Sequence, residues 1–177
     1  QLDRPVAIAN DANCFALSEA TDGAAKDAHS VFGVIVGTGT GAGLVLNGAV
    51  VQGRNGIAGE WGHNPLPWLN EDEYPGTRCW CGQSGCLETW LSGPAFMRDH
   101  QQQTGLNMTS ERIVAAAIEG NQSAQASLQR YASRMARGLA HVINIFDPEV
   151  IVLGGGMSNI QSLYTQVPEI WGDYIFS

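Results

Sequence analysis

The pattern of apolar and polar positions predicts strands that alternate with helices along this chain. A short apolar run over residues 4–9 ends at Asn10-Asp11. Apolar residues then recur at helical spacing from Ala12 until Thr21 and the Asp-Gly pair that follows it. This stretch predicts a strand, a polar turn and a helix.

A hairpin is predicted next. Residues 30–36 are β-branched and apolar, and a glycine-rich loop follows at 37–43. Two further apolar runs, 44–46 and 49–51, are separated by Asn-Gly, which is a strong hairpin signal. We therefore expect an antiparallel unit whose first turn is rich in glycine.

The rest of the chain is predicted to be mainly helical after one long irregular segment. Residues 53–91 show no lasting period, and such segments are usually functional or held by a metal. The later elements are a helix at about 93–103 capped by Ser92, a helix at 110–119 capped by Thr109 or Ser110, and a helix at 124–146. An apolar strand at 149–153 and a last helix at 162–175 follow. These helices are expected to supply core rather than chemistry, and the pattern indicates one α/β domain over residues 1–177.

Composition narrows the class of protein. Of the 177 residues 44% are apolar and 15% charged, which is typical of a globular core. The net charge of −8 argues against nucleic acid or an anionic membrane as the main partner. Neither a run of 18 apolar residues nor a signal peptide is visible, so we expect a cytoplasmic location.

The strongest motif combines one histidine with three cysteines. Gly59-Glu-Trp-Gly-His63 is followed by Cys79-Trp-Cys81-Gly-Gln-Ser-Gly-Cys86. Three thiolates and one imidazole are the ligand set of a closed tetrahedral zinc site, which leaves no position open for catalysis. Free buried thiols are the alternative, but the glycines between the cysteines suit a chain that folds around a metal. The zinc is expected to be structural.

Two glutamates bracket this motif. Glu60 lies three residues before His63, and Glu88 lies two residues after Cys86, so a folded metal loop would hold both carboxylates close together. Paired carboxylates suit the hydroxyl groups of a sugar. The alternative for each glutamate is an ordinary solvated surface position.

Three further motifs suggest a phosphorylated ligand. Asp11 lies where a strand meets a helix and could accept a hydroxyl proton, or it could simply cap the helix. The seven residues Gly37-Thr38-Gly39-Thr-Gly-Ala-Gly43 offer unobstructed backbone amides for phosphate oxygens, although a ligand-free hairpin is the alternative. Gly154-Gly155-Gly156 follows the last strand, where glycines would let an adenosine approach the backbone.

Taken in their order along the chain, these motifs resemble the ROK family of sugar kinases and related repressors. The resemblance implies the ribonuclease-H-like fold of the actin, hexokinase and Hsp70 superfamily, with a zinc-stapled loop insertion. It implies that residues 1–177 form the C-terminal domain, with the N-terminal domain and the last helix missing, and that this fragment alone is inactive. A cytoplasmic homodimer is also expected.

The resemblance also implies roles for individual residues. Asp11 becomes the catalytic base, while Asn10, Glu60, His63 and Glu88 bind the sugar. Gly37, Thr38, Gly39, Gly154, Gly155 and Gly156 would contact ATP, and His63, Cys79, Cys81 and Cys86 would bind zinc. His63 would serve both sites, with one ring nitrogen on zinc and the other toward a sugar hydroxyl.

The expected activity is ATP-dependent phosphoryl transfer to a hexose, with Mg²⁺ accompanying ATP. The fifteen residues between His63 and Cys79 resemble fructokinases and mannokinases, so fructose is the expected acceptor. N-acetylglucosamine kinase and glucokinase are the alternatives within the family. A sugar-sensing ROK repressor is the alternative of another class, and the presence of Asp11 and Thr38 favours the kinase.

Overall fold

The structure is a computed structural model and describes Arg4 and residues 8–176. The strand expected over residues 4–9 falls mainly on positions 5–7, outside the described residues. Ile8 and Ala9, which are described, belong to no strand.

A four-stranded mixed sheet forms the centre of the domain. The strands are β1 (Ser30–Val36), β2 (Thr40–Leu46), β3 (Ala49–Val50) and β4 (Val150–Gly154), in the order β3-β2-β1-β4. β1 pairs antiparallel with β2 and parallel with β4, and β2 pairs antiparallel with β3. Asn47 and Gly48 both have positive φ, as a two-residue hairpin turn requires, so the predicted Asn-Gly hairpin is confirmed.

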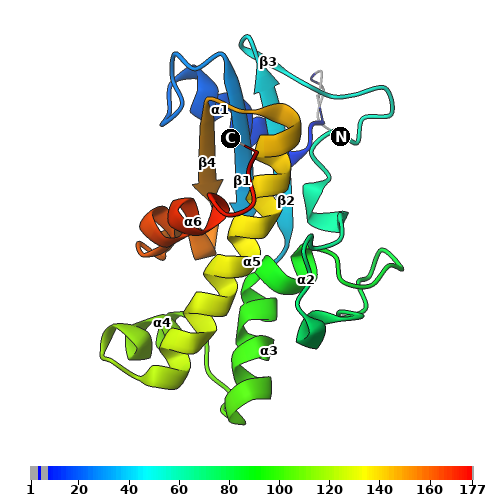
Figure 1. The fold of residues 1–177 in the computed structure, drawn as a ribbon. Helices are drawn as coiled ribbons and strands as arrows, with labels where there is room; N and C mark the ends of the chain where they lie inside the picture. The colour runs from blue at the N-terminus through cyan, green and yellow to red at the C-terminus, as the bar shows by residue number, and fades with distance from the viewer. Residues whose placement is uncertain (1–3, 5–7, 177) are drawn as a thin grey trace.

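Helices cover both faces of the sheet (Figure 1). Val31 of β1 and Val45 of β2 pack with Ala16 of α1 (Asp11–Thr21) on one face. Phe32, Val34 and Val36 belong to the larger core that includes α5 (Gln122–Phe146) on the other. The side-chain period of two along β1 therefore separates two apolar clusters, and the long helix crosses the sheet on the face opposite α1.

The remaining helices are α2 (Glu88–Leu91), α3 (Gly93–Thr104), α4 (Ser110–Ile118) and α6 (Leu163–Trp171). Side chains cap the starts of α3 and α4. The Ser92 hydroxyl accepts from the backbone N–H of Ala95, and the Thr109 hydroxyl accepts from that of Arg112. These bonds satisfy backbone donors that have no partner within the helix, and they confirm the predicted caps.

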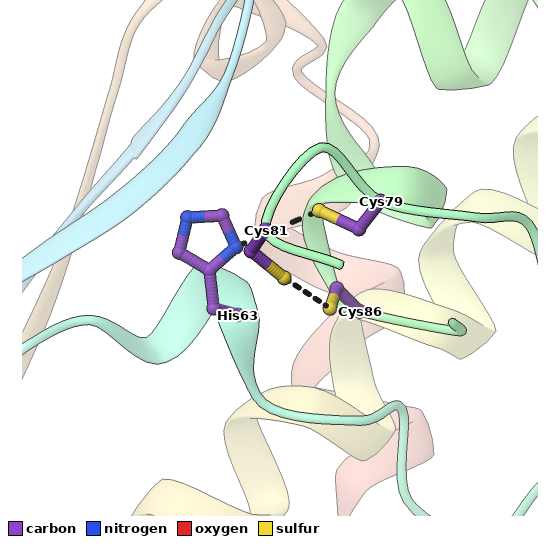
Figure 2. A group of neighbouring side chains, drawn as sticks. All are labelled: His63, Cys79, Cys81 and Cys86. Carbon is purple, nitrogen blue, oxygen red and sulfur yellow. Dashed lines mark hydrogen bonds between the residues drawn. The ribbon is translucent and has the colours of Figure 1, made fainter. Parts of the chain in front are cut away.

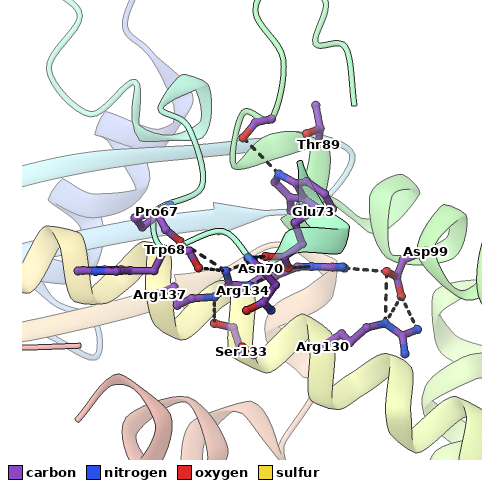
Figure 3. A network of polar contacts seen from close by, with 12 residues as sticks. Pro67, Trp68, Asn70, Glu73, Thr89, Asp99, Arg130, Ser133, Arg134 and Arg137 are labelled. Atoms are coloured by element: carbon purple, nitrogen blue, oxygen red, sulfur yellow. Dashed lines mark hydrogen bonds and ion pairs between the residues drawn. The ribbon is translucent and has the colours of Figure 1, made fainter. Parts of the chain in front are cut away.

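The segment between β3 and α2 contains only two short 3₁₀ turns, Trp61–His63 and Glu71–Glu73, as its lack of period predicts. A buried ion cluster attaches it to the helices (Figure 3). Glu73 accepts from Arg134 Nε at 2.9 Å and from Arg137 at 2.8 Å. Asp99 of α3 then bridges Arg134 and Arg130 at 2.7 Å each.

Burial makes this cluster important for stability. Glu73 is 3% exposed and Arg137 is 1% exposed. Burial by itself raises the pKa of Glu73, but hydrogen bonds from Arg137 and Arg134 outweigh it and lower the pKa to about 2. The sequence gives no signal for this cluster, because its members lie far apart and only the fold brings them together.

Glu73 is expected to make stability depend on pH. Its pKa in the folded protein lies below the ordinary 4.5, so its contribution is complete above that value and is lost as pH falls toward 2. The shift corresponds to about 3 kcal/mol of unfolding free energy. Glu73→Gln should lose about 3 kcal/mol at pH 7, because it leaves the buried Arg137 without a carboxylate partner.

Urea unfolding at pH 7, 5 and 2.5 measures both effects. Glu71→Gln is the matched control, because Glu71 lies in the same turn and is exposed. An unfolding free energy that falls equally with pH in the wild type and in Glu73→Gln would contradict the assignment.

Candidate functional site

The residues expected at the sugar and at the phosphates lie around one cavity of about 420 Å³. This polar cavity is lined, among others, by Asn10, Asp11, Gly37, Thr38, Gly39, Glu60, His63 and Glu88. They come from the start of α1, the β1–β2 turn, the Trp61–His63 turn and the start of α2. Four separate stretches of sequence therefore converge on one site.

Asp11 is the first residue of α1, and its neighbour Asn10 is the helix cap. Asn10 Oδ1 accepts from the backbone N–H groups of Ala12 at 2.9 Å and Asn13 at 3.2 Å. Asp11 Oδ1 also accepts from Ala12 N at 2.9 Å, and among the described residues no protein donor reaches its Oδ2. The capping function therefore belongs to Asn10, and one oxygen of the exposed Asp11 carboxylate is available to a ligand.

The glycine-rich stretch is shorter as a loop than the sequence suggests, and the expected seven-residue cradle is wrong. Residues 40–43 belong to β2 and pair with β1, so only Gly37, Thr38 and Gly39 form the turn. Gly43 faces the backbone of Ala12 in α1, where a Cβ would collide. This glycine permits close packing of helix on strand. Within the described residues, the amides of Thr38 and Gly39 have no protein acceptor.

Two glycines bring Glu60 and His63 to the cavity. Gly59, with φ of 93°, lies against the carbonyl oxygen of Ala42, and Gly62 lies against that of Thr40. Any side chain at either position would collide with the backbone of β2. The Gly-x-x-Gly spacing therefore presses this turn onto β2.

The carboxylate of Glu88 is held from two directions. Its Oε2 accepts from the backbone N–H of Thr40 at 3.0 Å, and its Oε1 accepts from the indole N–H of Trp80 at 2.7 Å. Thr40 follows the glycine turn, and Trp80 lies between two of the cysteines. Glu88 therefore connects the cysteine loop to the β1–β2 turn, and each oxygen keeps a lone pair for a ligand hydroxyl.

His63, Cys79, Cys81 and Cys86 form a compact group, here called the Cys3His cluster (Figure 2). Their ligand atoms all lie within 4.8 Å of one another. Cys79 Sγ lies 3.6 Å from His63 Nδ1, and Cys81 Sγ lies 3.6 Å from Cys86 Sγ. Zn–S bonds of about 2.3 Å in a tetrahedron place two sulfurs about 3.8 Å apart, whereas a disulfide needs about 2.05 Å. The donors and their spacing fit a metal ion.

The local environment of the thiols is consistent with this fit. Burial and the neighbouring Cys81 and Cys79 raise the pKa of Cys86 to about 12. The pKa of Cys81 is lowered instead, chiefly by a hydrogen bond from the backbone N–H of Gln83. A bound cation would favour the thiolate form of both cysteines. Figure 2 shows the second ring nitrogen of His63 pointing away from the sulfurs, so one imidazole contributes to both the cluster and the polar cavity.

A second and larger cavity, of about 680 Å³, adjoins the same turn. It has apolar walls from α3, α4 and the 3₁₀ turn Gly156–Asn159, including Met97, Val114, Ile118, Met157 and Ile160. α3 and α4 therefore line this apolar cavity as well as contributing to the core. Their apolar residues follow an ordinary core pattern, so no signal distinguishes them in the sequence.

The three glycines 154–156 at the end of β4 lie in different surroundings. Gly156 lines the apolar cavity. Gly154 packs against the ring of Phe15, and Gly155 has a φ of 83° and lies against the carbonyl oxygen of Val36. Only the last of the three therefore faces a ligand-sized space.

Comparison with known proteins identifies the class. The ROK family model matches residues 1–177, and the chain belongs to the ROK family. It is 43% identical over 173 residues to an N-acetyl-D-glucosamine kinase of Salmonella paratyphi B, covering 96% of this chain and 57% of that protein. The chain thus spans little more than half the length of the curated relatives it matches.

Solved structures agree with this placement. A ROK hexokinase from Thermus thermophilus superposes with a TM-score of 0.85 at 35% identity, over 97% of this chain and 56% of that one. A ROK family glucokinase from Streptomyces griseus, crystallised with glucose and AMPPNP, superposes with a TM-score of 0.85 at 28% identity. This match covers 99% of this chain and 60% of that one. A ROK family transcriptional regulator homologous to the E. coli MLC protein superposes with a TM-score of 0.81 at 32% identity, over 95% of this chain and 44% of that one. In the described part of the chain, no helix is both long and apolar enough to cross a membrane.

The close approach of Gly62 to β2 can be tested directly. Gly62→Ala should lower the unfolding free energy by more than about 2 kcal/mol, because its Cβ would meet the Thr40 carbonyl and the backbone would have to shift. Gly156→Ala is the control, since its Cβ meets nothing within 4 Å. Chemical denaturation measures both, and equal stability of the two variants would refute the packing argument.

Proposed function

We propose that the intact protein transfers phosphate from ATP to a hydroxyl group of a hexose. One observation carries this proposal: the polar and apolar cavities share Gly37 and Thr38. A nucleotide base in the apolar cavity and a sugar in the polar cavity would meet at this turn. Phosphoryl transfer requires such a meeting point, because the transferred group has to lie in line between donor and acceptor.

On the acceptor side, the proposed base is Asp11. The uncommitted Oδ2 of its carboxylate would take the proton of a sugar hydroxyl as the hydroxyl attacks phosphorus. Glu60, Glu88 and the second nitrogen of His63 would bind other hydroxyls of the hexose. The side-chain amide N–H₂ of Asn10 remains available as a donor, because only its oxygen is used in capping.

On the donor side, the unpaired amides of Thr38 and Gly39 are proposed to bind phosphate oxygens. The polar rim of the apolar cavity, with Thr109, Ser110 and Asn159, suits a ribose, and Gly156 allows the nucleoside close to the backbone. Mg²⁺ is expected to enter with ATP and to neutralise charge on the phosphates.

For the Cys3His cluster we propose a structural zinc. Four protein donors complete a tetrahedron, so the ion would supply rigidity rather than chemistry. His63 would bind it through Nδ1, which fixes the ring so that Nε2 faces the polar cavity.

The identity of the hexose is the finest part of the proposal. Curated relatives at 42–43% identity are N-acetyl-D-glucosamine kinases, so we propose N-acetylglucosamine as the preferred candidate for the acceptor. Fructose is the second, because the fifteen residues between His63 and Cys79 resemble those of fructokinases.

A sugar-sensing regulator is the rival function, because a ROK regulator shares this fold. A sensor has to bind a sugar but has no need of a base beside a turn with unpaired amides. Asp11 and the Thr38–Gly39 amides together therefore support the kinase.

Replacement of the base tests the reaction. In the intact protein Asp11→Asn should lower kcat by about 1,000-fold and leave the Kd for the hexose within about threefold, because only proton acceptance is lost. A coupled assay with N-acetylglucosamine, fructose, mannose and glucose measures turnover, and calorimetry measures binding. Asp22→Asn, just after the same helix, is the control. Unchanged turnover in Asp11→Asn would sink the base assignment.

The metal is tested by elemental analysis. The purified protein should hold one zinc per chain, and Cys81→Ser should lose it because a four-ligand site then lacks a thiolate. Cys14→Ser should keep its zinc, since Cys14 lies in α1 outside the cluster. A full complement of zinc in Cys81→Ser would refute the four-ligand site.

A further inference from the structure

Trp80 occupies an unusual place for a large apolar side chain. It lies between Cys79 and Cys81, and 80% of its surface is exposed. Burial therefore does not explain its position, unlike that of Trp61, which is 4% exposed in the core. Its position is explained instead by its contacts with two side chains that line the polar cavity.

The first contact is with Glu88. The indole N–H donates to Glu88 Oε1 at 2.7 Å, which is short for a nitrogen donor and typical of a bond to a charged acceptor. The other oxygen of the same carboxylate accepts from Thr40 N at 3.0 Å. Two donors from separate segments fix the plane of the carboxylate, and one of them is the side chain of Trp80.

The second contact is with His63. The two rings meet edge to face, with centroids 4.8 Å apart and an interplanar angle of 87°. This arrangement is favourable for aromatic pairs and restricts rotation of the imidazole. His63 Nδ1 faces Cys79, so the restricted rotation keeps the other nitrogen directed away from the sulfurs.

We infer that Trp80 is a positioning residue for the hexose, because its indole orients both Glu88 and His63 toward the polar cavity. It does not line the cavity itself, so it acts through these two groups. The inference rests on the proposed hexose kinase function. It adds that hexose affinity depends on the residue between the first two cysteines, which supplies no metal ligand.

The test uses Trp80→Phe in the intact protein. Phenylalanine keeps a ring against His63 but removes the N–H donor to Glu88. We expect the hexose KM, and the hexose Kd measured by calorimetry without ATP, to rise about tenfold, as loss of one hydrogen bond to a charged group implies. The KM for ATP should stay within about twofold, and the zinc content should not change.

Trp90→Phe is the matched control. Its indole N–H donates to the carbonyl oxygen of Gly85 at 3.2 Å in the same loop, but neither Glu88 nor His63 is its partner. It should lose stability without a selective loss of hexose affinity. In a double-mutant cycle, Trp80→Phe should add little to Glu88→Ala, because the alanine has no acceptor for the indole N–H.

The outcomes separate the two proposals. An active wild type whose hexose KM is unchanged in Trp80→Phe overturns the role of Trp80 alone. Loss of zinc, or an equal loss of hexose and ATP affinity, also overturns it, because the indole would then be a structural support. A wild type that neither binds nor phosphorylates a hexose overturns the proposed function.

Discussion

The site depends on closure of the segment between β3 and α2. This segment contains little regular structure, and only short backbone pairings, such as Leu66 N with Gly85 O and Leu87 N with Asn64 O, join its parts. The Cys3His cluster joins its two ends by bringing His63 beside Cys79, Cys81 and Cys86. The buried pairing of Glu73 with Arg134 and Arg137 fixes its middle to α5. Glu60, His63 and Glu88 can then face the β1–β2 turn.

In the proposed function, the hexose and the nucleotide would bind in two cavities that meet at the β1–β2 turn. The polar cavity gathers carboxylates, an imidazole and an amide, which suit hydroxyl groups. The apolar cavity is walled by α3 and α4, whose lining suits the flat face of a base. Gly37 and Thr38 lie between the two. As the proposed phosphate site, this short turn with two unpaired amides would be more restricted than a seven-residue loop.

Much of this could be predicted from the sequence, and the reasons differ between elements. The Asn-Gly hairpin and the helix caps follow local rules, so Asn47, Ser92 and Thr109 lie as predicted. The grouping of His63 with the three cysteines could be predicted, because the cysteines lie close together in sequence with glycines between them. The seven-residue loop predicted from the glycines at 37–43 was wrong, because glycine also occurs where a helix packs closely on a strand. In β2, Gly43 makes room for α1 rather than for phosphate.

The rest could not be predicted because it depends on long-range contacts. Glu73, Asp99 and Arg134 lie far apart in sequence, and each is ordinary in its own surroundings. The same holds for the apolar cavity, whose lining residues have the spacing of any core-facing helix. Trp80 is visible in the sequence, but its contact with Glu88 appears only in the folded loop.

We propose that the Cys3His cluster holds in place the groups proposed to bind the hexose. The most direct measurement is the Kd of the intact protein for its hexose, determined by calorimetry before metal removal by a chelator, after it and after zinc is returned. The affinity for the hexose should fall at least about tenfold when the metal is removed, because Glu88 and His63 then lose their fixed positions. It should recover when zinc is returned. Hexose affinity that is unchanged in the metal-free protein would contradict this proposal.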